Sequence, residues 1–280
     1  MQPLILVTND DGIRSAGLRA AAEAASTLGD VLIVAPKIEQ TGMGRSFPKT
    51  HGQGVIEVCW GSLGGATVPY YAVNGSPAQA VAHAVLEIAP TCPALCISGI
   101  NDGENLGGTN LISGTVGAAL EAAGSGIPAL AVSIGPEDPD LFLKPYREAD
   151  WAAAVRVVRQ FGTAALCDGL PPEVALLNIN IPSSATPETE IRATIQSRQS
   201  HYICARPCSR DFLEPFRLPV AEKIDFATLE PNSDLYAFFV DGVVSVTPMG
   251  CDLTVRDAKG APLDVCSGKK TAGTHQRTKR

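Results

Sequence analysis

Short apolar runs alternate with Ala-rich amphipathic stretches along the first 185 residues. The first run, residues 4–8, is rich in strand formers, and a helix-forming stretch from Leu18 to Leu28 follows it. A second apolar run, residues 31–35, comes directly afterwards. A strand, a helix of about three turns and a second strand form a βαβ unit, whose parallel strands are buried on both faces. The pattern therefore predicts an α/β fold.

The same alternation continues to residue 181. We expect residues 55–59 and 68–73 to form a hairpin at the sheet edge, because the Gly-rich residues 61–65 separate them. Ser76 and Pro77 are suited to cap and begin a helix that runs to Ile88. The other predicted elements are strands at 94–98, 127–134 and 174–181 and helices at 114–123 and 150–161. Together they predict a doubly wound, mostly parallel, three-layer sheet over residues 1–185.

The regular pattern ends after Pro182. Pro, Arg, Ser and isolated aromatic residues dominate to about residue 232, and then residues 235–240 and 242–246 have the pattern of strands. Residues 186–266 are therefore predicted to form a projecting arm with closing strands, which packs either on a neighbouring subunit or back on its own domain. Residues 267–280 carry five basic side chains and no large apolar one, which predicts a flexible basic tail.

Composition narrows the class of protein. With 45% hydrophobic and 18% charged residues the chain is an ordinary globular one. No stretch approaches the roughly 18 uncharged apolar residues of a membrane span, and residues 1–7 lack a basic leader, so we expect an unanchored cytoplasmic protein. The net charge of -7 argues against binding a nucleic acid duplex, which requires clustered Lys and Arg. Small-molecule chemistry fits better.

Cysteine and histidine contribute no recognisable motif. The eight cysteines are too sparse for a disulfide scaffold and most lie in apolar stretches, so we expect buried, reduced thiols. His201, Cys204 and Cys208 lack both the paired spacing and the fourth ligand of a zinc site. We expect His83 to be packed or half-exposed in its helix. His201 either lies in a solvated loop or reaches a phosphate or base.

Polar residues follow three of the predicted strands. They are residues 8–12 (TNDDG), 39–42 (EQTG) and 98–103 (SGINDG). In an open parallel sheet the ligand crevice lies beyond the carboxyl ends of the strands. We therefore expect these three loops to share one end of the sheet.

Asp10 and Asp11 lie where a buried strand meets a Gly turn. Two adjacent carboxylates there repel each other unless a cation or hydrogen-bond donors compensate. A hard divalent ion, Mg²⁺ or Mn²⁺, prefers carboxylate, hydroxyl and amide oxygens as ligands. The candidate ligands are Asp10, Asp11, Thr41 and Asn101. The alternative is an Asx turn in which Asn9 and Asp10 cap the following helix.

The sequence Ser113-Gly114-Thr115 opens the Ala-rich helix at 114–123. A helix start of this composition presents free backbone amides and hydroxyls to an anion, and so predicts a phosphate site. The alternative is simple N-capping by Ser113. The Gly- and Asn-rich residues 103–110 join this segment to Asn101, so one crossover can bring metal ligand and phosphate site together. The motifs of a P-loop, a dinucleotide fold and a nucleophile elbow are absent.

Six blocks of the sequence resemble the SurE family of survival proteins, and they occur in the family's order. The blocks are residues 4–12 (LILVTNDDG), 73–78 (VNGSPA), 98–107 (SGINDGENLG), 113–122 (SGTVGAALEA), 177–182 (LNINIP) and 241–248 (DGVVSVTP). The resemblance implies a Rossmann-like, metal-dependent phosphatase that acts on nucleoside monophosphates. It also implies a homodimer or homotetramer whose subunits exchange the C-terminal arm.

The resemblance assigns roles residue by residue. Asp10 and Asp11 match the paired carboxylate ligands, and Asn101 matches the asparagine of the family's S-G-I-N block. Ser113 and Thr115 match the phosphate-contacting S-G-T block. The chain departs from the family in two places. Thr41 stands where a serine is usual, and of the arginines that precede the His201-Tyr202 pair only Arg198 is present, which leaves base preference and polyphosphate activity open.

The resulting hypothesis is hydrolysis of a phosphomonoester by water activated at one divalent ion per subunit. Asp10 and Asp11 are the predicted catalytic residues, with Asp10 accepting the proton of the water. The predicted phosphate ligands are Asn9, Ser113, Gly114 and Thr115. The alternatives are a non-catalytic nucleotide-binding module and a metal-dependent nucleotidyl or glycosyl transferase. An aspartate acting as nucleophile also stays open.

Overall fold

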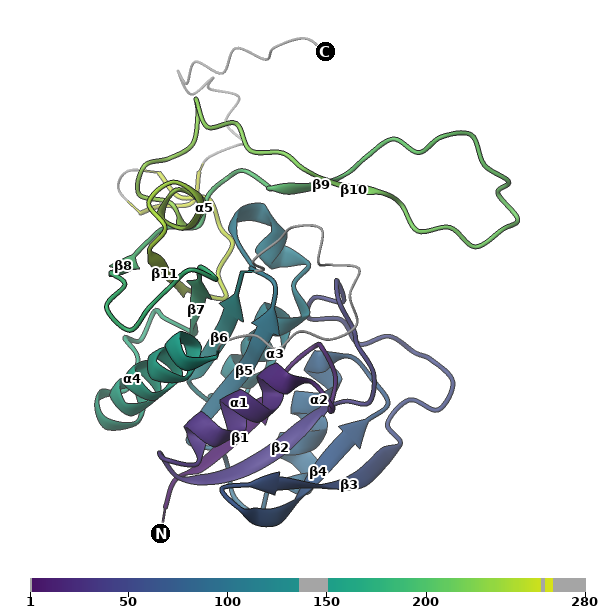
Figure 1. Ribbon diagram of the computed structural model, residues 1–280, viewed down its shortest axis with the longest axis vertical. Helices are drawn as coiled ribbons and strands as arrows, with labels where there is room; N and C mark the ends of the chain where they lie inside the picture. Colours follow the sequence, from purple (N-terminus) through teal and green to yellow (C-terminus); the bar gives the residue numbers. More distant parts are fainter. Residues whose placement is uncertain (1, 136–150, 258–259, 264–280) are drawn as a thin grey trace. The chain divides into compact units, whose positions relative to one another are not determined.

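The computed structural model of the chain describes residues 2–135, 151–257 and 260–263 (Figure 1). The chain forms two compact units, residues 1–249 and 250–280. In the second unit Arg256 and Pro262 form an antiparallel bridge. The division into residues 1–185, 186–266 and 267–280 stays a prediction, and the tail at 267–280 lies outside the described residues.

A nine-stranded sheet forms the centre of the larger unit, in the order β3-β4-β2-β1-β5-β6-β7-β11-β8 (Figure 1). Its strands are β1 Leu4–Thr8, β2 Asp30–Pro36, β3 Ile56–Leu63, β4 Ala66–Val73, β5 Leu95–Asp102, β6 Ala129–Ile134, β7 Leu176–Ile181, β8 Ile191–Ala193 and β11 Val244–Met249. Neighbouring strands are parallel except in the pairs β3–β4 and β7–β11. The predicted mostly parallel sheet and its edge hairpin are confirmed.

Helices cover both faces of the sheet. On one face α1 (Ala16–Ala25) packs with α4 (Ala152–Asp168), and on the other α2 (Pro77–His83) packs with α3 (Gly114–Gly124). Each face has its own buried apolar cluster, one including Leu18 and Val157, the other including Val81 and Val116. This is the three-layer, Rossmann-like α/β arrangement that the alternating pattern predicts.

The start of α2 shows how closely local chemistry fixes these elements. The hydroxyl of Ser76 accepts from the backbone N–H of Gln79, and the Gln79 side chain accepts from the Ser76 N–H, which completes a capping box with Pro77 in the first turn. The predicted helix to Ile88 continues beyond α2 as a wider π-helical turn, Ala84–Ile88.

The prediction of a strand at residues 235–240 is wrong. This segment forms a short helix, α5 (Asp234–Phe239), capped by the Ser233 hydroxyl, which accepts from the Tyr236 N–H. A continuous apolar run has no period that distinguishes a strand from a buried helix, and Ser233 was the signal in favour of the helix. The second predicted strand, residues 242–246, begins at Val244 and is β11.

Residues 205–219 join β9 (Tyr202–Cys204) and β10 (Val220–Glu222), which pair antiparallel. The two strands and their connection, residues 202–222, extend away from the sheet in Figure 1 and are called the hairpin below. Among the described cysteines none forms a disulfide, and Cys96 is buried as expected, whereas Cys92 and Cys251 are exposed. Over residues 2–135, 151–257 and 260–263, no helix combines the length and hydropathy that a bilayer span requires.

Candidate functional site

The strand order reverses next to β1. From β1 the chain passes through α1 to β2 on one side, and later places β5 on the other side of β1. In an open α/β sheet the ligand crevice forms at such a point, beyond the carboxyl ends of the two strands. Thr8, the last residue of β1, pairs with Ser98 in β5, which continues to Asp102. The backbone N–H of Asp102 lies 3.4 Å from Asp11 Oδ2.

The turn after β1 is held by Asn9. The buried Asn9 side chain donates to the Gly12 carbonyl and accepts from the Gly12 N–H, both at 3.2 Å. Gly12 has a φ of +98°, a conformation that favours glycine. Helix α1 is capped by Ser15, whose hydroxyl accepts from the Leu18 N–H. The alternative in which Asn9 and Asp10 cap this helix is therefore wrong, and Asn9 fixes the turn itself.

The N-terminus of α3 lies directly against Asp10. The Thr115 hydroxyl donates to Asp10 Oδ1 at 2.5 Å, and the Ser98 hydroxyl donates to the Thr115 carbonyl at 2.8 Å. A Cβ on Gly114 would lie 2.7 Å from both Asp10 Cβ and Asp10 Oδ2, so only glycine permits this approach. Ser113 caps the helix by accepting from the Val116 N–H at 3.1 Å. N-capping by Ser113 is therefore confirmed, and the phosphate site at this helix start stays a prediction.

The two aspartates lie in an unfavourable environment for ionised groups. Burial raises the pKa of Asp10 to about 6, against the lowering effect of the Thr115 hydrogen bond. Burial, followed by the charge of Asp10, raises the pKa of Asp11 well above its usual range. Glu39 adds to both effects. Within the part of the chain that the structure describes, neither aspartate forms an ion pair.

Of the other two candidate ligands, Asn101 lies near the end of β5 and Thr41 lies in the loop after β2. Asn101 donates its side-chain N–H to the Gly103 carbonyl at 2.6 Å, which leaves its amide oxygen as the atom able to bind a cation. The Gln40 N–H donates to the Asp10 carbonyl at 2.7 Å and so ties the second loop to the site. The exposed Thr41 donates its hydroxyl hydrogen to Glu39 Oε1 at 2.7 Å.

A cation at this place requires more than carboxylates. Over the described residues, no three side chains of His, Cys, Asp or Glu gather in a way that could hold a metal ion. Two carboxylates supplemented by amide and hydroxyl oxygens are ligands suited to a hard ion and not to zinc.

Further along the chain, Cys204 and Cys208 are exposed while His201 is fully buried, so these three residues do not form a common pocket.

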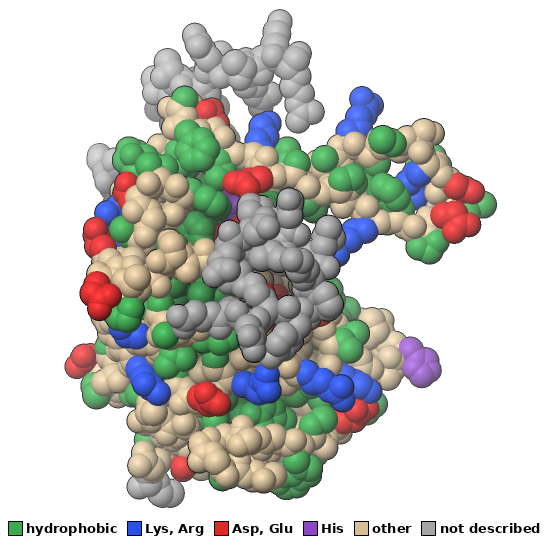
Figure 2. Space-filling view, in the orientation of Figure 1, with side chains coloured by type: hydrophobic (Ala, Val, Ile, Leu, Met, Phe, Trp, Pro, Cys, Tyr) green, Lys and Arg blue, Asp and Glu red, His purple; other side chains and the backbone are tan. Residues whose placement is uncertain are grey.

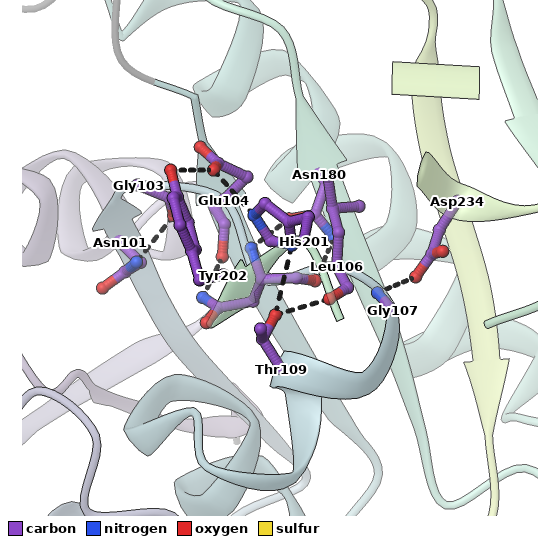
Figure 3. Close-up of polar contacts among 12 residues, drawn as sticks. Asn101, Gly103, Glu104, Leu106, Gly107, Thr109, Asn180, His201, Tyr202 and Asp234 are labelled. Atoms are coloured by element: carbon purple, nitrogen blue, oxygen red, sulfur yellow. Dashed lines mark hydrogen bonds and ion pairs between the residues drawn. The ribbon is translucent and has the colours of Figure 1, made fainter. Parts of the chain in front are cut away.

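Sequence reasoning missed two residues near the site, Glu39 and Glu104. Glu39 influences both aspartates, although only its neighbour Thr41 was singled out. Glu104 is buried and accepts hydrogen bonds from His201 and Tyr202 (Figure 3). The placement of His201 in a solvated loop is wrong, because this side chain has no exposed surface. Neither Glu104 nor His201 carries a local signal, because their contact spans 97 positions of the chain.

Comparison with known proteins gives a consistent result. The family model described as "Survival protein SurE" matches residues 5–203. A protein of Methanosarcina mazei named "5'-nucleotidase SurE" is 37% identical over 260 residues, which cover 91% of this chain and 95% of the relative. A protein of the same name from Thermococcus kodakarensis is 38% identical over 256 residues, covering 90% and 94%.

A solved structure agrees with the fold. The crystal structure of the SurE protein from Aquifex aeolicus matches with a TM-score of 0.69 at 29% sequence identity, over 90% of this chain and 95% of that one. The family match spans the turn after β1, the Asn101 loop and the start of α3. The chain belongs to the SurE family of survival proteins.

Proposed function

We propose that the protein is a metal-dependent phosphomonoesterase of the 5'-nucleotidase type, which hydrolyses nucleoside monophosphates. The observation that carries the proposal is the contact between Asp10 and the start of α3, made by Thr115 and Gly114. It places the buried Asp10 carboxylate, with the half-buried Asp11 beside it, next to a helix N-terminus, which attracts anions. The names of the archaeal relatives give the same reaction class.

The residues at the site fit a divalent ion. Burial raises the pKa of both Asp10 and Asp11, and the charge of Asp10 raises that of Asp11 further. A bound cation reverses this situation. The residues that would hold one Mg²⁺ or Mn²⁺ per subunit are Asp10, Asp11, Thr41 and Asn101. When bound, the ion supplies positive charge beside the phosphoryl oxygens and acidifies a nearby water.

The protein's own groups would divide the remaining work. Asp10 would accept the proton of the water, and the Thr115 hydrogen bond holds its carboxylate in one orientation. The N-terminus of α3, which carries partial positive charge, would attract the non-bridging phosphate oxygens, where negative charge increases during the reaction. Ser113 and Asn9 keep this turn and the β1 turn in place.

The test is phosphate release from a panel of 5'- and 3'-nucleoside monophosphates with Mg²⁺ or Mn²⁺ and with EDTA. We expect release that requires the metal and that is lost in Asp10→Asn. The control variant is Asp30→Asn, an exposed aspartate at the opposite end of the sheet. A protein that binds nucleotide but releases no phosphate with either metal contradicts the proposal and favours a binding module.

We further propose that the hairpin carries a contact between subunits of a homo-oligomer. Its loop presents apolar side chains to solvent, including Phe212 and Leu213, which are 85% and 92% exposed. Figure 2 shows these hydrophobic atoms spread along the projecting segment. Arg210 lies over the Phe212 and Phe216 rings at 5.1 and 4.6 Å. Such exposure in an unassociated chain is unfavourable.

Light scattering after size-exclusion chromatography tests this contact. We expect the intact protein to elute as a dimer or tetramer, and the double variant Phe212→Ser, Leu213→Ser to shift towards smaller species. A monomeric intact protein, or an unchanged oligomer in the double variant, contradicts the proposal.

A further inference from the structure

The loop between the end of β5 and the start of α3, residues 103–112, joins two parts of the proposed site. It begins after Asn101 and ends at Ser113. Its only regular structure is a short 3-10 helix, Gly107–Leu111. Its shape therefore depends on what packs around it.

Strand β7 holds the loop from within the domain. The Asn105 carbonyl accepts from the side-chain N–H groups of Asn178 and Asn180, both at 2.9 Å. The Asn105 N–H donates to Asn180 Oδ1 at 2.7 Å, and the Asn105 side chain donates to Ser133 at 2.8 Å. These bonds fix one residue in the middle of the loop.

The chain just before the hairpin holds the loop from the other side. Asp234 accepts from the Gly107 N–H at 2.8 Å through one oxygen and from the Ser197 N–H at 2.9 Å through the other. The Gln196 side chain donates to the Gly107 carbonyl, and the Gly108 N–H donates to the Gln199 carbonyl, both at 2.8 Å. Residues 196–199 thus follow the loop closely.

His201 completes this arrangement at a single buried point. Its Nε2 lies 3.0 Å from Glu104 Oε1, which also accepts from the Tyr202 hydroxyl at 2.7 Å (Figure 3). Because Nε2 faces a carboxylate oxygen, this nitrogen carries the hydrogen. On the other side of the ring, Nδ1 lies 3.5 Å from the hydroxyl of Thr109. One imidazole therefore contacts the loop at residues five positions apart.

The surroundings of His201 keep the ring in this orientation. It has no exposed surface and packs against the rings of Tyr202 and Phe239, with centroids 4.1 and 5.7 Å away. Burial by itself raises the pKa of Glu104, but the hydrogen bonds from His201 and Tyr202 outweigh it, and the pKa lies below its usual value. Both bonds are therefore made to an ionised carboxylate, which makes them strong.

We propose that His201 is a positioning residue, which through Glu104 and Thr109 fixes the loop that sets the Asn101 amide oxygen relative to Asp10 and Asp11. The inference rests on the proposed function, because Asn101 matters in this way only if the site binds a cation. It assigns to the root of the hairpin a direct influence on the site.

Asn101 and Glu104 are linked by a short stretch of chain. Glu104 follows Asn101 by three residues, and the Asn101 side chain is itself bonded to the Gly103 carbonyl between them. A displacement of Glu104 is therefore expected to displace Asn101 as well. The start of α3 is less exposed to such a shift, because Thr115 is tied independently to Asp10 and Ser98. The expected signature is weaker cation binding in a correctly folded protein.

The test uses full-length protein and Mn²⁺ alone, with affinity measured by titration calorimetry and thermal stability measured in EDTA. In His201→Leu the hydrogen bond to Glu104 and the contact with Thr109 are lost while the apolar packing is kept. We expect its Kd for Mn²⁺ to rise about tenfold and kcat at saturating metal to fall by a similar factor, as is typical when a residue that orients a metal ligand is removed. In His201→Gln a donor to Glu104 remains, and we expect the Kd to return to within about threefold of the wild-type value.

Two further variants keep the test decisive. His83→Leu is the matched control, because His83 also contacts a glutamate, Glu87 at 3.1 Å, but does so on the surface of α2; its Kd should be unchanged. Glu104→Gln keeps the size of the side chain and removes its charge, so it replaces His201→Leu if that variant does not fold, and a raised Kd is again expected.

The outcomes separate the inference from the proposed function. The inference alone is overturned if His201→Leu melts earlier but binds Mn²⁺ and turns over like the wild type. The same result in a folded Glu104→Gln protein overturns it where His201→Leu does not fold. Either result would leave His201 with a structural role. A wild-type protein that neither binds Mn²⁺ nor releases phosphate overturns the proposed function and this inference with it.

Discussion

The turn after β1 and the loop after β5 both carry buried carboxylates at the same end of the sheet, but they satisfy them differently. Glu104 accepts hydrogen bonds from an imidazole and a phenol. Asp10 has one hydroxyl donor, and burial leaves its pKa raised to about 6. The pKa of its neighbour Asp11 is also raised, by burial and by the charge of Asp10.

The difference separates groups that build the structure from groups that await a ligand. Charge-assisted hydrogen bonds lower the pKa of Glu104 despite its burial, so ionisation of this group favours the folded state. Ionisation of Asp10 disfavours the folded state, because the described residues provide no cation beside it. Natural proteins retain such a cost at functional sites.

The largest effect is expected from Asp11→Asn. Removing one of two carboxylates from a divalent-ion site should lower phosphate release by at least about 10³-fold, since the metal supplies several kcal/mol to the reaction. The fold should persist, because Asp11 accepts only a long backbone hydrogen bond of 3.4 Å. Steady-state assays beside Asp30→Asn provide the comparison, and residual activity above a tenth of wild type contradicts the role of Asp11.

Gly114→Ala should have the next largest effect. The new methyl group would lie 2.7 Å from the Asp10 side chain and would push α3 and the carboxylate apart, with an expected loss of about 10²-fold in kcat/KM. The matched control is Gly124→Ala at the other end of α3, where the nearest atom is the flexible end of Arg45. Equal kcat/KM in Gly114→Ala and Gly124→Ala would show that activity does not require the contact of Asp10 with α3.

Glu104→Gln sharpens the other side of the comparison through pH. Because the folded-state pKa of Glu104 is lowered, its stabilising contribution is complete above its unfolded pKa and is lost as the pH falls through the folded value. Urea unfolding should therefore show the variant less stable by about 1–2 kcal/mol at pH 7. The difference in free energy of unfolding between the wild type and Glu104→Gln should become smaller as the pH falls towards 3. A difference that is constant or absent across this range contradicts a stabilising role of the ionised Glu104.

The smallest effect is expected where a matched pair is exposed to solvent. Lys37 and Glu57 lie 2.6 Å apart, and about half of each side chain is accessible, at 47% and 49%. Water screens such a pair, so Glu57→Gln should change the free energy of unfolding by less than about 0.5 kcal/mol and leave activity unchanged. A loss as large as that of Glu104→Gln would mean that burial is not what distinguishes these carboxylates.

The sequence predicted the sheet because each parallel strand is an apolar run bounded by turn residues, as in Leu4–Thr8 and Ala129–Ile134. It failed at α5, where a continuous apolar run has no period. Strand β8 was not foreseen either, since Ile191–Ala193 is only three residues long and exists through its pairing with Val244–Val246.

The site divides in the same way. Asp10, Asp11 and Asn101 were predicted because polar residues after parallel strands must meet at one end of the sheet. Gly114 was predicted as part of a helix start, but its closeness to Asp10 depends on the packing of α3 against β5 and β6. The contact of His201 with Glu104 was beyond prediction, because it joins segments 97 residues apart with no periodic pattern in either.

The central claim is that Asp10 and Asp11 have no matching cation among the described residues because a divalent ion supplies the positive charge. The measurement is the free energy of unfolding at pH 7.5 for wild type and Asp10→Asn, in EDTA and then with Mn²⁺. Since the pKa of Asp10 is raised to about 6 in the folded state, its ionisation destabilises the metal-free protein above that pH, and the penalty fades as the pH falls towards 3.8.

Removing the charge should therefore stabilise the metal-free protein, by on the order of 2 kcal/mol. Mn²⁺ should raise the stability of the wild type and leave Asp10→Asn nearly unchanged, because a ligand stabilises only the state that binds it. A less stable Asp10→Asn in EDTA, together with equal stabilisation of both proteins by Mn²⁺, would contradict the account.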